Sequence, residues 1–423
     1  MIRRTAFLLI LAAFALVISP AEGEDPSAPY DVIGTCNKPE QFKALQKQVI
    51  PDVVELAGHY EPVARARHSR ARSRALEEYK PFADEFEAKW GEKGIEVLVR
   101  MMEPCLAPVF RSLAVSDKWY LRFRALYWLY FNEDEHSAEL FVENLTHENS
   151  MVREVAAVGL TMVLDSRTYK KEYSKKLANI LKGENDQFVS SALGTSLEML
   201  KKRKKPRVIY SCESKEDVGK RIRPYLNSYR PAPPSFKVKS YSRSGRSGRL
   251  KPTESWSYPV SGFHRKIIRG LKSVPFGELK TPTVYHLGED VAWFEEGIGT
   301  YAIADGVVRL VEAGKGDWGG FVVVEHRIDE DSYCCALYGH SGALLFAEPG
   351  DEVKAGQLIG SMGLSFSYEN GGHGSHIHFG IFKGEFDVSK CVGYRHKSKG
   401  KDDFHSPFEF LDKRVSKYDA DEQ

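Results

Sequence analysis

Apolar residues recur at intervals of three and four positions over roughly residues 39–205, where proline is sparse. This spacing places them on one face of a helix and predicts an α-helical region. From about residue 276 to residue 382 the pattern changes to short β-branched and aromatic runs bounded by Gly, Asp or Asn. Such runs predict the strands of a mostly antiparallel all-β domain. The chain is therefore expected to be multidomain, with an all-α N-terminal part and an all-β C-terminal part.

The helical region contains a loose internal repeat. Three similar copies lie at residues 120–125, 151–156 and 188–193. Each copy follows an Asp or Asn that could cap a helix, namely Asp117, Asn149 and Asp186. The copies are spaced by 31 and 37 residues, which is within the range of paired-helix solenoid repeats. The arrangement resembles HEAT-type repeats over roughly residues 113–202, and a generic helical bundle is the alternative.

A strongly basic segment separates the two parts. Residues 201–251 hold seventeen Lys or Arg against three acidic residues, whereas the whole chain has a net charge of only +2. Its Pro, Ser and Gly content predicts a linker or extended arm. The charge could simply be solvated, or it could attach the protein to an anionic polymer such as envelope polysaccharide, teichoic acid or nucleic acid. Aromatic residues are not interleaved with it as stacking platforms, so specific nucleic-acid binding is not expected.

The first residues have the pattern of a secretory signal peptide. Arg3 and Arg4 give a positive start, residues 6–18 form an uncharged apolar run, and small residues suited to cleavage are available at 21–23. The run is shorter than the ~20 residues that span a bilayer. An uncleaved anchor is the alternative. The mature protein is therefore expected to be exported, to the periplasm or the extracellular space.

The cysteines do not suggest a metal site. They do not form a CxxC ligand set, and the sequence cannot choose pairings among them. Cys334 and Cys335 are adjacent, so in a strand they face opposite ways, and we expect one buried and one exposed thiol. The six cysteines are Cys36, Cys105, Cys212, Cys334, Cys335 and Cys391.

Histidines provide the candidate chemistry. His376 and His378 are two residues apart, so on a strand both side chains point to the same face. His286 and Asp290 come from a separate segment and could close a site with them. Zinc in hydrolases usually takes three protein ligands from His, Asp, Glu or Cys and keeps a fourth position for water. Together with His340, this set predicts a metallohydrolase, although the HxxxD pair alone is a weak signal and the HxH pair alone a moderate one.

Residues 284–382 resemble the lysostaphin/LytM-type zinc metallopeptidases, whose domain is a compact antiparallel β fold. The HxxxD and HxH elements match, Tyr338-Gly339-His340 matches the family's Tyr-x-His element, and residues 349–360 match its glycine-rich stretch. The resemblance implies one Zn²⁺ per chain. It also implies a role for each of five residues: His286, Asp290 and His378 as zinc ligands, and His340 and His376 as catalytic residues that do not bind the metal.

The sequence departs from the family pattern next to the HxH element. Ser375 stands where the family usually has proline, and His373 is an extra imidazole that we place at the rim of the site. The loop at residues 366–368 would shape the substrate groove, so the preferred cross-bridge is left open. Glu289 and Glu325 are conceivable partners for the ring nitrogens of the ligand histidines.

These patterns predict a secreted zinc endopeptidase that cleaves peptide bonds in the stem peptides or cross-bridges of peptidoglycan. The alternative is a non-catalytic regulator or wall-binding adaptor, with a protein partner on the helical domain. The expected organisation is a signal peptide (1–23), a helical domain (24–202), a basic linker (203–255), a peptidase domain (256–386) and a C-terminal extension (387–423).

Overall fold

The structure is a computed structural model, and all residues that it describes belong to one compact unit, Leu45–Gln423. The expected signal peptide, Cys36, Cys105, Cys212, the loop at 366–368 and His373 lie outside the described residues, as does most of the basic segment. Within the described part, none of the helices has the length and apolar character needed to cross a bilayer. The described residues are 88–89, 99, 107–132, 134–208, 239–240, 250–261, 263, 274–291, 296–313, 318–363, 370 and 375–415.

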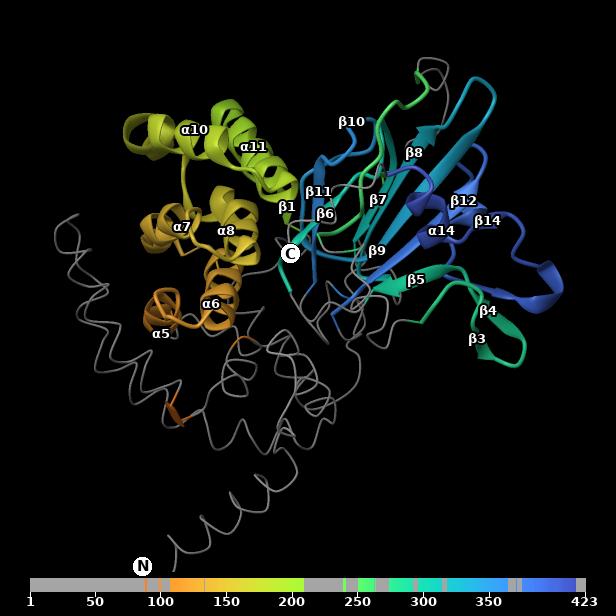
Figure 1. Cartoon of the computed structure of the whole chain (residues 1–423), viewed down its shortest axis with the longest axis horizontal. Helices are drawn as coiled ribbons and strands as arrows, with labels where there is room; N and C mark the ends of the chain where they lie inside the picture. The colour runs from red at the N-terminus through yellow and green to blue at the C-terminus, as the bar shows by residue number, and fades with distance from the viewer. Residues whose placement is uncertain are drawn as a thin grey trace, which may run out of the picture. The chain divides into compact units, whose positions relative to one another are not determined.

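Residues 107–202, where the structure describes them, are mainly helical, as the apolar periodicity predicts. Helix α8 packs against α6 and α11, so the three helices that carry the repeat copies lie in series (Figure 1). The described elements are α5 (Ala107–Leu113), α6 (Trp119–Phe131), η3 (Glu135–Ser137), α7 (Ala138–Asn144), α8 (Ser150–Val163), α9 (Ser166–Thr168), η4 (Tyr169–Tyr173), α10 (Ser174–Gly183) and α11 (Gln187–Lys202).

Two of the three expected helix caps are confirmed. The side chain of Asn149 accepts a hydrogen bond from the backbone N–H of Met151, and Asp186 caps α11 in the same way. The third expectation is wrong, because the N-cap of α6 is Lys118 and makes no side-chain cap bond. Asp117 therefore occupies the position before the N-cap of that helix.

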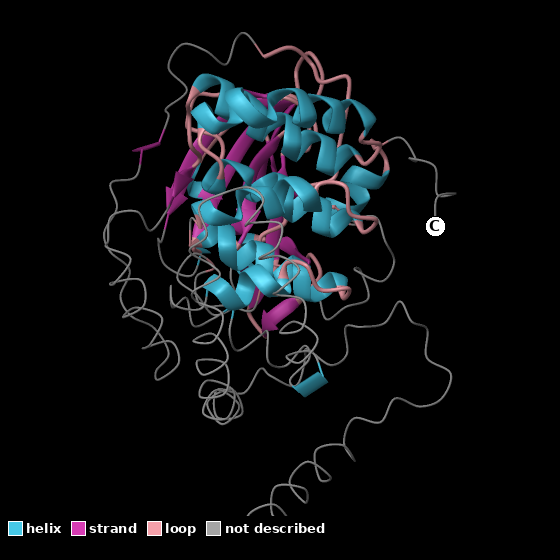
Figure 2. Ribbon diagram, turned by 90° about the vertical axis from the view of Figure 1, so that its left-hand side faces the viewer, coloured by secondary structure: helices cyan, strands magenta, loops and turns pink. Residues whose placement is uncertain are grey.

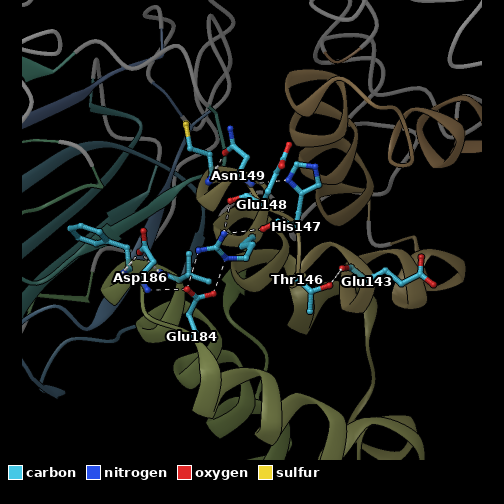
Figure 3. A network of polar contacts seen from close by, with 11 residues as sticks. Glu143, Thr146, His147, Glu148, Asn149, Glu184 and Asp186 are labelled. Carbon is cyan, nitrogen blue, oxygen red and sulfur yellow. Dashed lines mark hydrogen bonds and ion pairs between the residues drawn. The ribbon is translucent and has the colours of Figure 1, made fainter. Parts of the chain in front are cut away.

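Equivalent arginines link the first two repeat copies to their neighbours. Arg153 donates to the backbone carbonyls of His147 and Glu148 and forms a two-pronged ion pair with Glu184, at 2.8 and 3.0 Å. These three partners are labelled in Figure 3. Arg122, one repeat earlier, likewise donates to Ser116 and Val115 carbonyls and to Asn144. These parallel contacts support internal repetition, whereas the HEAT type of the repeat stays a prediction.

The C-terminal part is an antiparallel β structure, as predicted (Figures 1 and 2). The main sheet has the order β10-β7-β8-β9-β11-β6, and β12 pairs with β9, β5 and β14. A second sheet has the order β13-β4-β3. The strands are β3 (Leu279–Thr281), β4 (Val284–His286), β5 (Gly288–Val291), β6 (Gly299–Tyr301), β7 (Gly306–Ala313), β8 (Gly320–Arg327), β9 (Tyr333–Leu345), β10 (Glu352–Val353), β11 (Leu358–Met362), β12 (Ile377–Lys383), β13 (Tyr394–His396) and β14 (Phe404–His405).

Segments on both sides of the expected peptidase domain join its sheets. From the basic segment, β1 (Arg207–Val208) pairs with β9 and β2 (Lys239–Ser240) pairs with β7. From the C-terminal extension, β14 pairs with β12 and β13 pairs with β4, and helix α14 (Pro407–Asp412) follows. The exact domain boundaries stay a prediction.

Both faces of strand β9 are covered by apolar side chains. Cys334 and Cys335 face opposite ways, as their alternation predicts, and pack into two different hydrophobic clusters. The expectation of one exposed thiol is wrong, since both side chains are fully buried. Burial raises the pKa of Cys334 to about 12 and that of Cys335 well above its ordinary value, so neither is a reactive thiol.

A buried carboxylate connects the helices to the sheet. Glu154 on α8 accepts hydrogen bonds from the Gly299 N–H at 3.0 Å, the Tyr301 hydroxyl at 2.7 Å and the Ser261 hydroxyl at 2.8 Å. Next to it, the Tyr130 hydroxyl donates to the Gly297 carbonyl. Helices α6 and α8 therefore hold the segment that leads into β6, which follows shortly after Asp290 in the chain.

Candidate metal centre and active site

Strand β12 brings the sequence motifs together. It lies between β5 and β9, and His378 is the cross-strand partner of Asp290 on one side and of Gly339 on the other. Strands β4 and β5, separated only by Leu287, carry the HxxxD element. The sheet register therefore places the HxxxD, Tyr-x-His and HxH elements side by side.

Three of the predicted residues form a compact, buried cluster. His286 Nε2 lies 3.1 Å from Asp290 Oδ1, and His378 Nδ1 lies 2.9 Å from the same oxygen. The two ring nitrogens are 3.0 Å apart. Ligand atoms around a tetrahedral zinc with bonds of about 2.0–2.1 Å are separated by about 3.3 Å. The three donor atoms thus have the chemistry and the spacing to bind one metal ion.

The ring of His286 is held in one orientation by the backbone. Its Nδ1 lies 3.3 Å from the carbonyl oxygen of Pro275, so Nδ1–H donates to this oxygen and Nε2 is the nitrogen that faces the cluster. The partner that orients His286 is thus a backbone carbonyl, which the sequence did not predict. Glu325 instead pairs with Arg309, while Glu289 accepts from the backbone N–H of Phe276.

The electrostatics of the cluster favour charged Asp290 beside neutral histidine. Burial alone would raise the pKa of Asp290, but hydrogen bonds with His286 and His378 hold it far below its ordinary value. Burial lowers the pKa of His378. A carboxylate and unprotonated imidazoles are the forms that bind divalent zinc.

His340 and His376 lie next to the cluster. Their ring centroids are 4.3 Å apart, and His376 Nε2 is 3.8 Å from Asp290 Oδ1. His340 Nδ1 lies 2.9 Å from the carbonyl oxygen of Asn370, so Nδ1–H donates to this oxygen. His340 also has a φ of 57°, in the left-handed region that non-glycine residues rarely adopt. Such strain is found most often at functional sites. All five predicted site residues therefore come together.

Trp318 is a site residue that the sequence analysis missed. Its ring contacts His378 edge-to-face, with 5.0 Å between centroids, and stacks on Phe321. Two glycines make room for it, because a Cβ at Gly339 would lie 2.4 Å from the Trp318 ring and a Cβ at Gly393 would lie 2.8 Å from it. Gly339, at the centre of the Tyr-Gly-His element, was the only available signal.

We expect Gly339→Ala to destabilise the protein by about 1–3 kcal/mol, the usual range for overpacking. The new methyl group would overlap the Trp318 ring, which Gly393 confines on another side. Chemical denaturation measures the effect. The control is Gly194→Ala in α11, where a Cβ meets no atom within 4 Å and should stabilise the helix slightly. Equal unfolding midpoints for the two variants would contradict this account of Trp318.

Comparison with known proteins identifies this part of the chain. Residues 284–390 match Peptidase family M23. These residues form an M23 peptidase domain. The match includes the metal cluster, His340 and His376, and it confirms the metallopeptidase family that the motifs predict. No curated protein matches the sequence of the chain.

Three solved structures resemble parts of the M23-containing chain. One is a mutant catalytic domain of the prophage-encoded M23 protein EnpA from Enterococcus faecalis, with 27% identity over 27% of this chain and 85% of that one, and a TM-score of 0.22. The second is a putative M23 peptidase from Pseudomonas aeruginosa. It is 22% identical over 31% of this chain and 48% of that one, with a TM-score of 0.22. The third is a zinc-containing peptidase from Vibrio cholerae. It is 23% identical over 31% of this chain and 37% of that one, with a TM-score of 0.23.

Proposed function

We propose that the protein is an exported zinc endopeptidase that hydrolyses peptide bonds in the stem peptides or cross-bridges of peptidoglycan. One observation supports it most strongly: within an M23 domain, a buried His-Asp-His cluster with metal-binding spacing lies beside two further histidines. A regulator that has lost catalysis would have no need of this complete set. We take the metal to be zinc because two imidazoles and a carboxylate are typical zinc ligands in hydrolases.

Each residue of the site has a proposed role. His286, Asp290 and His378 would hold the zinc ion, which supplies a Lewis acid that activates water and polarises a carbonyl group. The Pro275 carbonyl fixes the orientation of His286. The Asn370 carbonyl fixes the tautomer of His340, so that His340 Nε2 can accept a proton.

The proposed reaction balances with one water molecule. A C–O bond forms between water and the peptide carbonyl carbon, and the C–N bond breaks. His340 takes the proton that the water loses as it attacks. His376, whose ring centroid lies 4.3 Å from that of His340, receives this proton from His340 and passes it to the departing amine, so both imidazoles end as they began. The products are a new carboxyl group and a new amino group.

The surroundings of the domain suit an envelope substrate. The signal-peptide pattern at residues 1–23 would direct the chain to the periplasm or the extracellular space. The excess of positive charge over residues 201–251 would hold it near anionic envelope polymers, in addition to peptidoglycan itself. The helical domain would offer a surface for a protein partner.

Digestion of purified peptidoglycan by the mature chain tests this function. We expect cleavage at a single type of peptide bond, which releases soluble muropeptides with new amino groups. Mass spectrometry of these muropeptides identifies the bond. A parallel digestion adds a cell-wall amidase. If the chain cuts nothing alone but accelerates the amidase, the adaptor alternative is correct and the peptidase proposal is wrong.

A further inference from the structure

The small sheet β13-β4-β3 forms one side of the metal cluster. Tyr394 on β13 is the cross-strand partner of the candidate ligand His286 on β4. The Leu287 N–H donates to the Gly393 carbonyl at 2.9 Å and fixes β13 at this position. Tyr394 follows the last residue of the M23 match, so this strand is a feature of the chain beyond the family domain.

The ring of Tyr394 lies over two candidate zinc ligands. Its centroid is 5.2 Å from that of His286 and 6.2 Å from that of His378. Even so, 38% of the residue is exposed, in contrast to the fully buried His286. An aromatic ring that is both exposed and adjacent to the reacting centre can contact a bound substrate over its face.

A positive charge lies against the same ring. Lys280 on β3 places Nζ 4.0 Å from the Tyr394 ring centroid, a cation–π contact that holds the exposed ammonium group near the cluster. The surrounding segments, 278–286 and 394–403, contain five Lys or Arg and three acidic residues. One of the three, Asp403, is paired with Arg395 at 2.9 Å. The remaining balance is positive and favours a negatively charged ligand.

We propose that Tyr394 and Lys280 form a wall of the substrate groove that selects peptides with a free carboxylate near the cleaved bond. The Tyr394 ring contacts the peptide, and the Lys280 ammonium group pairs with the carboxylate. Lysine suits this task because its ammonium is a compact charge on a flexible stem. The inference rests on the proposed peptidase function and specifies its substrate as an acidic peptide.

The test uses the zinc-loaded mature chain and two cross-linked muropeptide dimers. In one, the D-glutamate α-carboxylate is free, and in the other it is converted to the amide. We expect the wild type to prefer the free carboxylate. Lys280→Ala should lower kcat/KM for this dimer about two- to fivefold, in line with an exposed ion pair, and leave the amide dimer unaffected. Lys280→Arg should keep the preference, and Lys175→Ala, at an exposed lysine on helix α10, is the matched control.

Tyr394→Ala should raise KM for both dimers about five- to tenfold with a smaller change in kcat, because the variant loses the aromatic contact with the peptide and keeps the Lys280 ammonium group. Tyr394→Phe should behave like the wild type. Zinc content should stay at one ion per chain in every variant. Loss of zinc in Tyr394→Ala would show that the ring only supports His286, and an unchanged preference in Lys280→Ala would overturn the charge assignment.

Failure of the proposed function would be distinguishable from failure of this inference. If the wild type cleaves neither dimer, the peptidase proposal fails. Calorimetric titration then still measures how tightly the chain binds each dimer, and so whether Tyr394 and Lys280 favour the free carboxylate. The inference would be supported if the wild type binds the free-carboxylate dimer more tightly than the amide dimer and Lys280→Ala binds both equally. Equal binding of both dimers by the wild type would refute it.

Discussion

Replacing His378 by alanine is expected to remove bound zinc and peptide hydrolysis together. His378 Nδ1 is one of three donor atoms in the cluster, and two ligands alone would hold zinc weakly. We expect activity to fall at least about 10³-fold, because losing a single oxyanion-stabilising group already costs about 10²–10³. Metal analysis and muropeptide release, measured on the same preparation, give both quantities.

Two further variants separate metal binding from catalysis. His340→Ala should retain zinc and lose about 10²–10⁴-fold in kcat, the usual contribution of a general acid–base residue. His136→Ala, an exposed histidine on η3, should match the wild type in both measurements. Full zinc content with full activity in His378→Ala would show that the cluster is not the metal site.

Glu154→Gln is expected to change how the stability of the protein depends on pH. Burial raises the pKa of Glu154 from 4.5 to about 7 in the folded chain, and the hydrogen bonds it accepts offset only part of this effect. The folded state therefore favours the protonated form. This stabilisation is complete below about pH 4.5 and is lost as the pH rises through about 7, by roughly 3 kcal/mol in total.

Glutamine keeps the acceptor for the Gly299 N–H and the Tyr301 hydroxyl, but it does not titrate. The unfolding free energy of the wild type, relative to Glu154→Gln, should therefore fall by roughly 3 kcal/mol between pH 4.5 and pH 8. Chemical denaturation of both proteins across this range measures it, and other titrating groups cancel in the difference. Parallel pH profiles would mean that Glu154 is not buried between α8 and β6.

The fold and the grouping of the candidate metal ligands were predictable because their signals are local. Strand alternation alone places His376 and His378 on one face. Apolar periodicity and polar cap residues likewise define helices such as α8 and α11 within single segments. Each of these elements can be predicted from its own segment of sequence, and the pairing of the strands then brings the segments together.

The remaining features depend on contacts between segments that share no motif. Pro275 acts through its backbone carbonyl, so its side chain gives no signal. Trp318 and Tyr394 reach the cluster only through the pairing of strands distant in sequence. Glu154 has the sequence context of a surface residue and is buried only because β6 packs against α8. Cys335 is covered for a similar reason, by a second layer of apolar residues that local alternation cannot reveal.

The most direct test of the central claim is a zinc titration of the metal-free mature chain during digestion of peptidoglycan. Bound zinc and new amino groups are measured at each addition. The account predicts that hydrolysis is absent without zinc, rises in proportion to bound zinc and is complete at one ion per chain. Hydrolysis by the metal-free chain, or one bound zinc without any cleavage, would contradict it.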